Sequence, residues 1–145
     1  MNHEGCDYAA CLKQRGIVAV LVKYRVSSLD RAGFQFPVPL LDARRAIRVT
    51  RTRAEEWGVD PSKVGVIGSS AGGHLASMCA TLSEGKFPEV GKDAVDQQPC
   101  RPDFAVLVYS VIGMDESWGH SGSKHRLLGE IPDPAPTSGY PPPRG

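Results

Sequence analysis

The part of the sequence best suited to chemistry is GSSAGG at residues 68–73, where a central serine has a glycine two residues away on each side. A G-x-S-x-G pattern is typical of a nucleophile elbow, a sharp turn that exposes the serine between a strand and a helix. Such a turn brings backbone segments close together, and we expect Gly68 and Gly72 to supply the small residues it needs. The pattern predicts that Ser70 attacks a carbonyl carbon. The backbone amide of Ala71, at the positive end of a helix, would then stabilise the oxyanion.

The segments on either side of residues 68–73 fit an elbow better than a phosphate-binding loop. A short apolar run of strand type precedes the motif, and helical character follows it from Gly72 to Leu82. A glycine-rich loop at the start of a helix can also bind phosphate through its N–H groups. The Lys-Ser or Lys-Thr pair of such loops does not follow these glycines, however. We therefore interpret the motif as an elbow around Ser70, with the flanking members Gly68, Ser69, Gly72 and Gly73.

Strand-type and helical segments alternate along the chain, which determines the expected fold class. Continuous apolar runs, typical of strands buried on both faces of a parallel sheet, occupy residues 17–22, 63–67 and 104–112. Apolar residues at helical spacing occupy residues 4–15, 40–57 and 72–82. Loops rich in glycine, proline or polar residues cover 25–39 and 83–102. This order predicts an α/β fold of three layers (αβα), in which helices cover both faces of a mainly parallel sheet.

The expected helix at 40–57 carries a row of arginines: Arg44, Arg45, Arg48, Arg51 and Arg53. Basic side chains along one helix can bind nucleic acid. The chain as a whole has a net charge of only +1, from 17 basic and 16 acidic residues, so no overall field favours such a partner. We expect instead a solvated outer face with Glu55 and Glu56 nearby, and no nucleic-acid partner.

Composition excludes several other classes of protein. A chain of 145 residues with 41% hydrophobic and 23% charged residues is typical of one globular domain. No apolar run reaches the roughly 18 residues of a membrane helix, and no signal peptide is visible, which leaves the compartment open. The four cysteines and four histidines lack the spacing of a zinc site, so we expect no metal and no cofactor. The oligomeric state is left open.

Several blocks of the sequence resemble the α/β-hydrolase serine esterases and lipases, within them the carbohydrate acetyl esterase or acetylxylan-esterase-like branch. These blocks are VGVIGSSAGGHLASMCATL with the upstream GIVAVLVKYRV, PLLDARRAIR and EEWGVDPSKVG, and the downstream RPDFAVLVYSVI and HRLLGE. The resemblance covers roughly residues 2–130. It implies that Ser70 is the nucleophile, that the Ala71 amide is an oxyanion donor, and that the substrate is a small acyl ester or an acylated carbohydrate. It implies a packing or helix-capping role for His74, rather than that of the base.

Two parts of the family's pattern are missing from this sequence. No HGGG-type loop, the family's first oxyanion element, precedes Ser70. The family's acid and histidine would follow two further strands, and only weak substitutes, Asp115 and His120 or His125, follow the third apolar run. We therefore expect a partial hydrolase fold, truncated at both ends, with little activity alone. Without the strand before that loop, the runs at 17–22 and 63–67 would either pair directly or leave two sheet edges unpaired.

The last fifteen residues differ from the rest of the chain. Residues 131–145 hold six prolines, which exclude both a helix and an interior strand. We expect a partial hydrolase domain over residues 1–130, followed by a proline-rich unstructured tail over 131–145. Two rival functions stay open: a non-catalytic hydrolase-like module, and a segment of a dipeptidyl-type serine peptidase, which shares the elbow.

Overall fold

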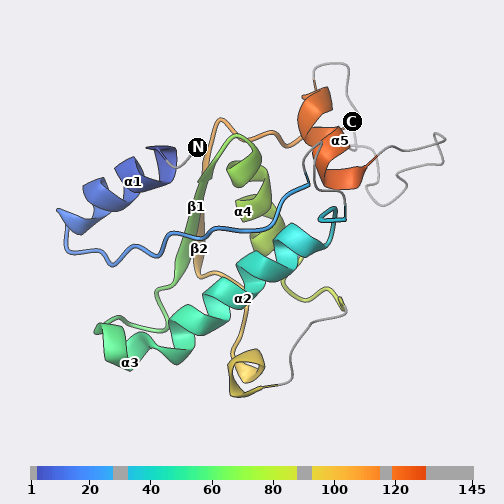
Figure 1. The fold of residues 1–145 in the computed structure, drawn as a ribbon. Helices are drawn as coiled ribbons and strands as arrows, with labels where there is room; N and C mark the ends of the chain where they lie inside the picture. The colour runs from blue at the N-terminus through green and yellow to red at the C-terminus, as the bar shows by residue number, and fades with distance from the viewer. Residues whose placement is uncertain (1–2, 28–32, 88–92, 115–118, 130–145) are drawn as a thin grey trace, which may run out of the picture.

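The computed structural model describes residues 3–27, 33–87, 93–114 and 119–129 (Figure 1). Its helices are α1 (His3–Lys13), α2 (Val38–Thr52), α3 (Ala54–Trp57), α4 (Ala71–Thr81), α5 (Ser121–Leu128) and the short 3₁₀ helix η1 (Ala94–Gln97). The strands are β1 (Gly65–Ser69) and β2 (Phe104–Val108). They pair in parallel, with Gly65 opposite Phe104 and Ser69 opposite Val108. Helices and a parallel sheet together form an α/β architecture, as the alternating segments predicted.

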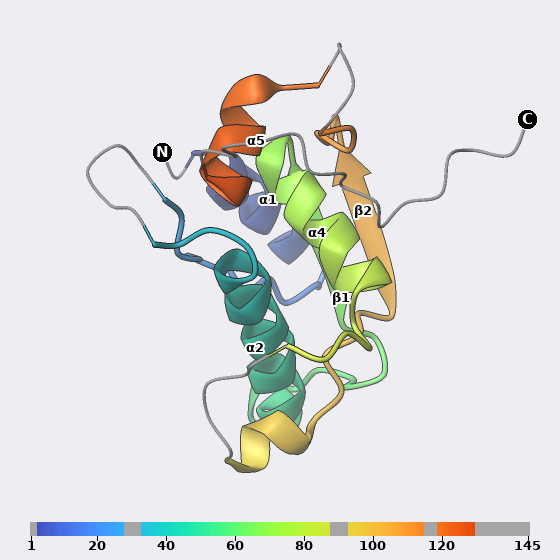
Figure 2. The same ribbon diagram turned by 90° about the vertical axis from the view of Figure 1, so that its right-hand side faces the viewer.

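Helix α4 lies between α2 and the two strands, as Figure 2 shows. The buried residues of α2 recur at helical spacing, so they share one side of the helix, and this side packs on α4. Together with Val64, directly before β1, the two helices form a core of Leu40, Ala43, Ile47, Val64, Leu75, Met78 and Cys79. This packing fixes α4 against β1 and β2, so the turn that joins β1 to α4 rests on the best-packed part of the molecule.

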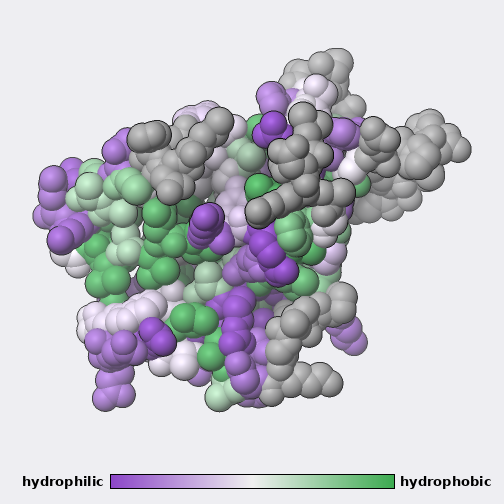
Figure 3. Space-filling model, in the orientation of Figure 1, coloured by the Kyte–Doolittle hydropathy of each residue, from purple (hydrophilic) through white to green (hydrophobic). Residues whose placement is uncertain are grey.

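The expected strand at residues 17–22 is absent. That segment runs from α1 towards α2 in an extended course, and no sheet pairing involves it (Figure 1). A strand is stabilised by a ladder of hydrogen bonds with a neighbouring strand, and the only sheet among the described residues, β1 with β2, does not include residues 17–22. Their apolar side chains are therefore exposed, up to 55% at Leu21, and contribute to the apolar surface in Figure 3. The prediction was wrong here because apolar composition alone does not provide a pairing partner.

The other expected elements shift by a few residues. The second predicted strand lies at 65–69 instead of 63–67, and the third ends at Val108 instead of continuing to 112. It ends there because Tyr109 has a φ of 36°, which breaks an extended strand. The predicted helix at 40–57 is divided at Arg53 into α2 and α3. Helix α5 was not predicted.

The arginines of α2 do not form a solvated face. Arg44 and Arg48 are only 5% and 9% exposed. The guanidinium of Arg44 donates to the carbonyl of Gly85 at 3.0 Å, and that of Arg48 donates to the carbonyl of Gln98 at 3.0 Å. The connection between α4 and β2 covers this side of the helix, and its free carbonyls need donors there. The expectation of a solvated face was therefore wrong.

Two expectations remain, one on the proline-rich tail and one on membrane-spanning helices. Residues 131–145 lie outside the described residues, so the proline-rich tail stays a prediction. Among the helices that the structure describes, none has both the length and the apolar character required to cross a membrane.

Candidate active site

Ser70 occupies the turn between β1 and α4. Its backbone has φ 50° and ψ −118°, a region that non-glycine residues rarely adopt, and it lies directly between Ser69 of β1 and Ala71 of α4. A strained serine at a strand-to-helix turn is the backbone geometry of a nucleophile elbow. The local order predicted from G-x-S-x-G is the order found.

Two glycines make this sharp turn possible. A Cβ on Gly68 would overlap the backbone of Gly72, and a Cβ on Gly73 would overlap the side chain of Ser110. A Cβ on Gly72, in contrast, would meet no atom within 4 Å. The expectation that Gly72 supplies the close approach was therefore wrong. Gly68, the first glycine of the motif, allows β1 to approach α4 closely. Gly73, directly after the motif, allows α4 to approach the loop that follows β2.

Backbone hydrogen bonds hold Ser70 against the end of β2. The amide of Ser70 donates to the carbonyl of Val108 at 3.0 Å. The carbonyl of Ser70 accepts from the amides of His74 at 3.1 Å and Val111 at 3.3 Å. Ala71 is the first residue of α4, so its amide has no acceptor within the helix. That N–H group, at the positive end of the helix dipole, can donate to a developing oxyanion.

The loop that follows β2 packs directly on the elbow. Tyr109 takes a φ of 36°, a second strained residue next to the first. The hydroxyl oxygen of Ser110 is buried and has no hydrogen-bond partner among the described residues. Because the same hydroxyl occupies the space beside Gly73, the loop and the first turn of α4 fit together closely.

His74 connects α4 to this loop. Its Nδ1 lies 2.7 Å from the carbonyl oxygen of Val111, and since a carbonyl only accepts, Nδ1 must carry the proton. Burial of the half-exposed ring lowers the pKa of His74, while the hydrogen bond to Val111 partly opposes this. The side chain does not cap α4, one of the two expected roles. It tethers the loop after β2.

Of the weaker catalytic candidates, the structure describes His120 and gives its hydrogen-bond partners. His120 lies at the start of α5, where its Nδ1 accepts from the amide of Ser123 at 3.0 Å. An accepting Nδ1 leaves the proton on Nε2, which is the wrong tautomer for a base that must take a proton from serine through that atom. Asp115 lies outside the described residues. No described hydrogen bond joins either His120 or His125 to Ser70.

No cluster of ligating side chains accompanies the elbow. Across the described ranges, no three His, Cys, Asp or Glu side chains gather as a metal site would require. Cys6 and Cys11 are exposed, whereas Cys79 and Cys100 are buried, and all four are free thiols. Burial, with the nearby Cys100, raises the pKa of Cys79 to about 12, so this thiol stays protonated.

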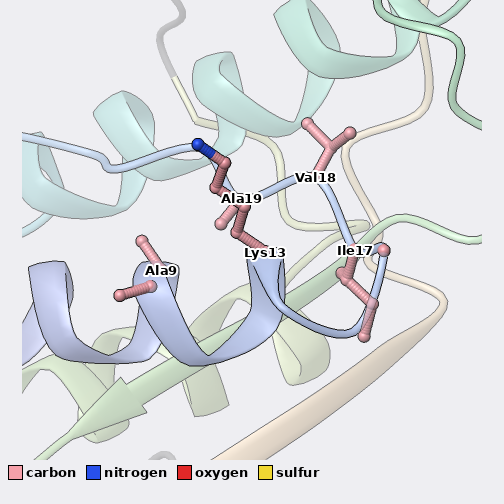
Figure 4. A pocket seen from close by; sticks show the side chains of 7 residues that line it. Ala9, Lys13, Ile17, Val18 and Ala19 are labelled. Atoms are coloured by element: carbon pink, nitrogen blue, oxygen red, sulfur yellow. The ribbon is translucent and has the colours of Figure 1, made fainter.

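A hollow of about 560 Å³ lies away from the elbow, between α1 and the segment that follows it (Figure 4). Its lining is mostly apolar and includes Ala9, Lys13, Ile17, Val18 and Ala19. Ser70 does not line it, and Lys13 is the one charged residue in its lining. The hollow is therefore a separate feature from the turn at Ser70.

Comparisons with known proteins agree with an esterase-type elbow. The BD-FAE family model matches residues 3–117. An acetylxylan esterase of Xylanibacter ruminicola is 34% identical over 129 residues, covering 89% of this chain and 23% of the relative. An acetyl ester-xyloside bifunctional hydrolase from Caldicellulosiruptor lactoaceticus is 41% identical over 88% of this chain, with a TM-score of 0.75. An esterase from Thermogutta terrifontis is 32% identical over 83% of it, with a TM-score of 0.63. The chain spans 44% of each of these two solved chains and about a quarter of the acetylxylan esterase.

Proposed function

The chain belongs to the BD-FAE family and is similar to solved esterases of the α/β-hydrolase type, and from this premise we propose that it acts as a serine esterase on short acyl esters. The observation that carries the proposal is the strained backbone of Ser70 between β1 and α4. Strain of about 1 to 3 kcal/mol persists only where surrounding structure enforces it, and this is typical of functional positions.

In the proposed reaction, Oγ of Ser70 attacks the ester carbonyl and the alcohol leaves, which forms an acyl-enzyme. The amide of Ala71 donates a hydrogen bond to the negative oxygen of the tetrahedral intermediate. Water then attacks the acyl group and releases the acid, restoring the serine. No cofactor takes part in this scheme.

A base must accept the proton of Ser70 when the hydroxyl attacks. His120, together with Asp115, is the weak candidate within this chain, and Nδ1 of His120 would have to give up its contact with Ser123 to serve. We therefore expect slow turnover by this chain, even where Ser70 itself is reactive.

The proposed substrate class is acetylated carbohydrate, in particular acetylated xylan fragments. The names of two relatives support it: one is an acetylxylan esterase and the other an acetyl ester-xyloside bifunctional hydrolase. The acyl group would then be acetyl, and the leaving group a sugar hydroxyl.

Labelling with a fluorophosphonate tests the proposal, because this reagent reacts once with an activated serine and needs no turnover. We expect a single label on the peptide that contains Ser70. The label should be lost in Ser70→Ala and kept in the neighbouring control Ser69→Ala. An unlabelled wild-type chain, or equal labelling of Ser70→Ala, would identify a non-catalytic module instead.

Substrate competition then separates esterase from peptidase. Acetylated xylo-oligosaccharide is expected to slow the labelling of Ser70, whereas a dipeptide amide is expected to leave it unchanged. Protection by the dipeptide alone would favour the peptidase hypothesis.

A further inference from the structure

The amide of Ala71 shares one peptide unit with the carbonyl of Ser70, so whatever holds that carbonyl also aims the amide. A trans peptide is planar, and its C=O and N–H groups point in opposite directions. The carbonyl of Ser70 accepts two hydrogen bonds, one from the amide of His74 within α4 and one from the amide of Val111. The bond from His74 is the ordinary hydrogen bond of the first turn of α4. The bond from Val111 comes from the loop that follows β2.

The position of Val111 depends in turn on the side chain of His74. Nδ1–H of His74 donates to the carbonyl oxygen of Val111 at 2.7 Å, while the amide of the same Val111 donates to Ser70 at 3.3 Å. One residue of the loop is thus held at both of its backbone polar groups. The buried hydroxyl of Ser110 against Gly73 fixes the adjoining residue by packing.

We propose that His74 is a positioning residue, whose hydrogen bond to Val111 holds the loop that aims the Ala71 amide at the oxyanion. The role rests on the proposed function of Ser70. His74 does not touch the substrate in this arrangement, and it acts through Val111 and the carbonyl of Ser70. The tether requires the Nδ1–H tautomer, which places the ring's bare nitrogen at Nε2.

Two substitutions separate the hydrogen bond from the bulk of the ring. His74→Asn places an amide N–H donor close to the position of Nδ1, whereas His74→Leu keeps a side chain of moderate size and removes the donor. Met78→Leu, a change of similar volume at a buried position on the same helix, serves as the control for packing.

The readouts are hydrogen exchange of the Val111 amide and the rate at which fluorophosphonate labels Ser70. We expect His74→Leu to speed the exchange of Val111 about tenfold by freeing the loop. Labelling should slow by about tenfold, because a misaimed oxyanion donor loses much of its effect. His74→Asn should restore most of both, and Met78→Leu should change neither. Unchanged exchange in His74→Leu, or no rescue by His74→Asn, would overturn the proposal.

Failure of the proposed function has a different signature. If Ser70 of the wild-type chain takes up no label, the esterase proposal falls, while the exchange of Val111 still supports or overturns the tether. If His74→Leu does not fold, the ¹⁵N spectrum of the wild-type imidazole decides. A protonated Nδ1 with slow exchange supports the tether, and a protonated Nε2 with a bare Nδ1 overturns it.

Discussion

At the scale of single residues, the strained backbone of Ser70 is stabilised by residues at the end of β2 and in the loop after it. Both Ser70 and Tyr109 adopt positive φ values, at a cost of about 1 to 3 kcal/mol each. The hydrogen bonds that join Ser70 to Val108 and Val111 offset part of this cost. Strain at the end of β1 and strain at the end of β2 therefore persist together.

A matched pair of glycine substitutions tests this arrangement. Gly73→Ala should lower the free energy of unfolding by about 1 to 3 kcal/mol, because its Cβ would overlap Ser110 in a packed site. Gly72→Ala should leave stability unchanged or raise it slightly, since its Cβ meets open space and alanine favours a helix. Urea denaturation of both variants measures the difference. Equal losses at the two positions would show that Ser110 does not restrict this turn.

The lowered pKa of His74 makes the stability of the folded chain depend on pH. Burial holds this pKa below its ordinary value of 6.5, so the unfolded chain binds a proton more readily than the folded one. The neutral ring's contribution to stability is complete above about pH 6.5 and is lost as the pH falls towards the folded pKa. The melting temperature should therefore drop from pH 7.5 to pH 5.5, and it should drop less in His74→Asn. A drop of equal size in that variant would assign the pH dependence to other groups.

At the scale of elements, the sequence predicted the parts with short-range causes and missed those with long-range causes. The turn at 68–73 and the helix after it follow from local residue types, and both were predicted within a residue or two. The role of Gly73 depends on Ser110, thirty-seven positions away, which no local pattern reveals. Likewise, residues 17–22 have the composition of a strand, but pairing depends on a neighbour.

The arginines of α2 illustrate the same limit. Their spacing placed them on one side of a helix, and from sequence that side was expected to be solvated. The segment 93–103 lies over it, with its carbonyls bonded to arginine side chains. Arg51 is the clearest case, because its guanidinium contacts the carbonyls of Pro61 and Arg101 and lies 3.1 Å from the carboxylate of Asp103. The same carboxylate accepts from the amide of Val64, directly before β1.

We predict that Arg51 aligns the beginnings of the two strands. Arg51→Met keeps the apolar stem and removes the donors, and it should lower the free energy of unfolding by about 2 kcal/mol. Arg53→Met is the control on the same helix end: the Arg53 side chain is 56% exposed and its carboxylate partner, Glu56, is 3.8 Å away. That change should cost less than about 0.5 kcal/mol. Urea denaturation measures both, and similar losses would remove the aligning role from Arg51.

At the scale of the whole molecule, the buried core lies on one side and much apolar surface lies on the other. Helices α2 and α4 bury their shared core, while residues of β2 and of the segment 17–22 stay open to solvent. Val106 is 43% exposed and Val20 is 44% exposed. Figure 3 shows such apolar surface beside α1. A sheet of two strands leaves backbone groups at its edges without a ladder in the described residues.

This exposure predicts that the chain associates with itself as its concentration rises. Exposed apolar strands favour edge pairing, and a net charge of +1 provides little repulsion between copies. The substitutions Val20→Lys and Val106→Lys, each adding a charge to the open apolar surface, should shift sedimentation velocity profiles towards the monomer. Gln97→Lys on η1 adds the same charge at an exposed site outside the sheet, and it should leave association unchanged. If all three variants reduce association equally, net charge controls it; if none does, the apolar surface is not the site of contact.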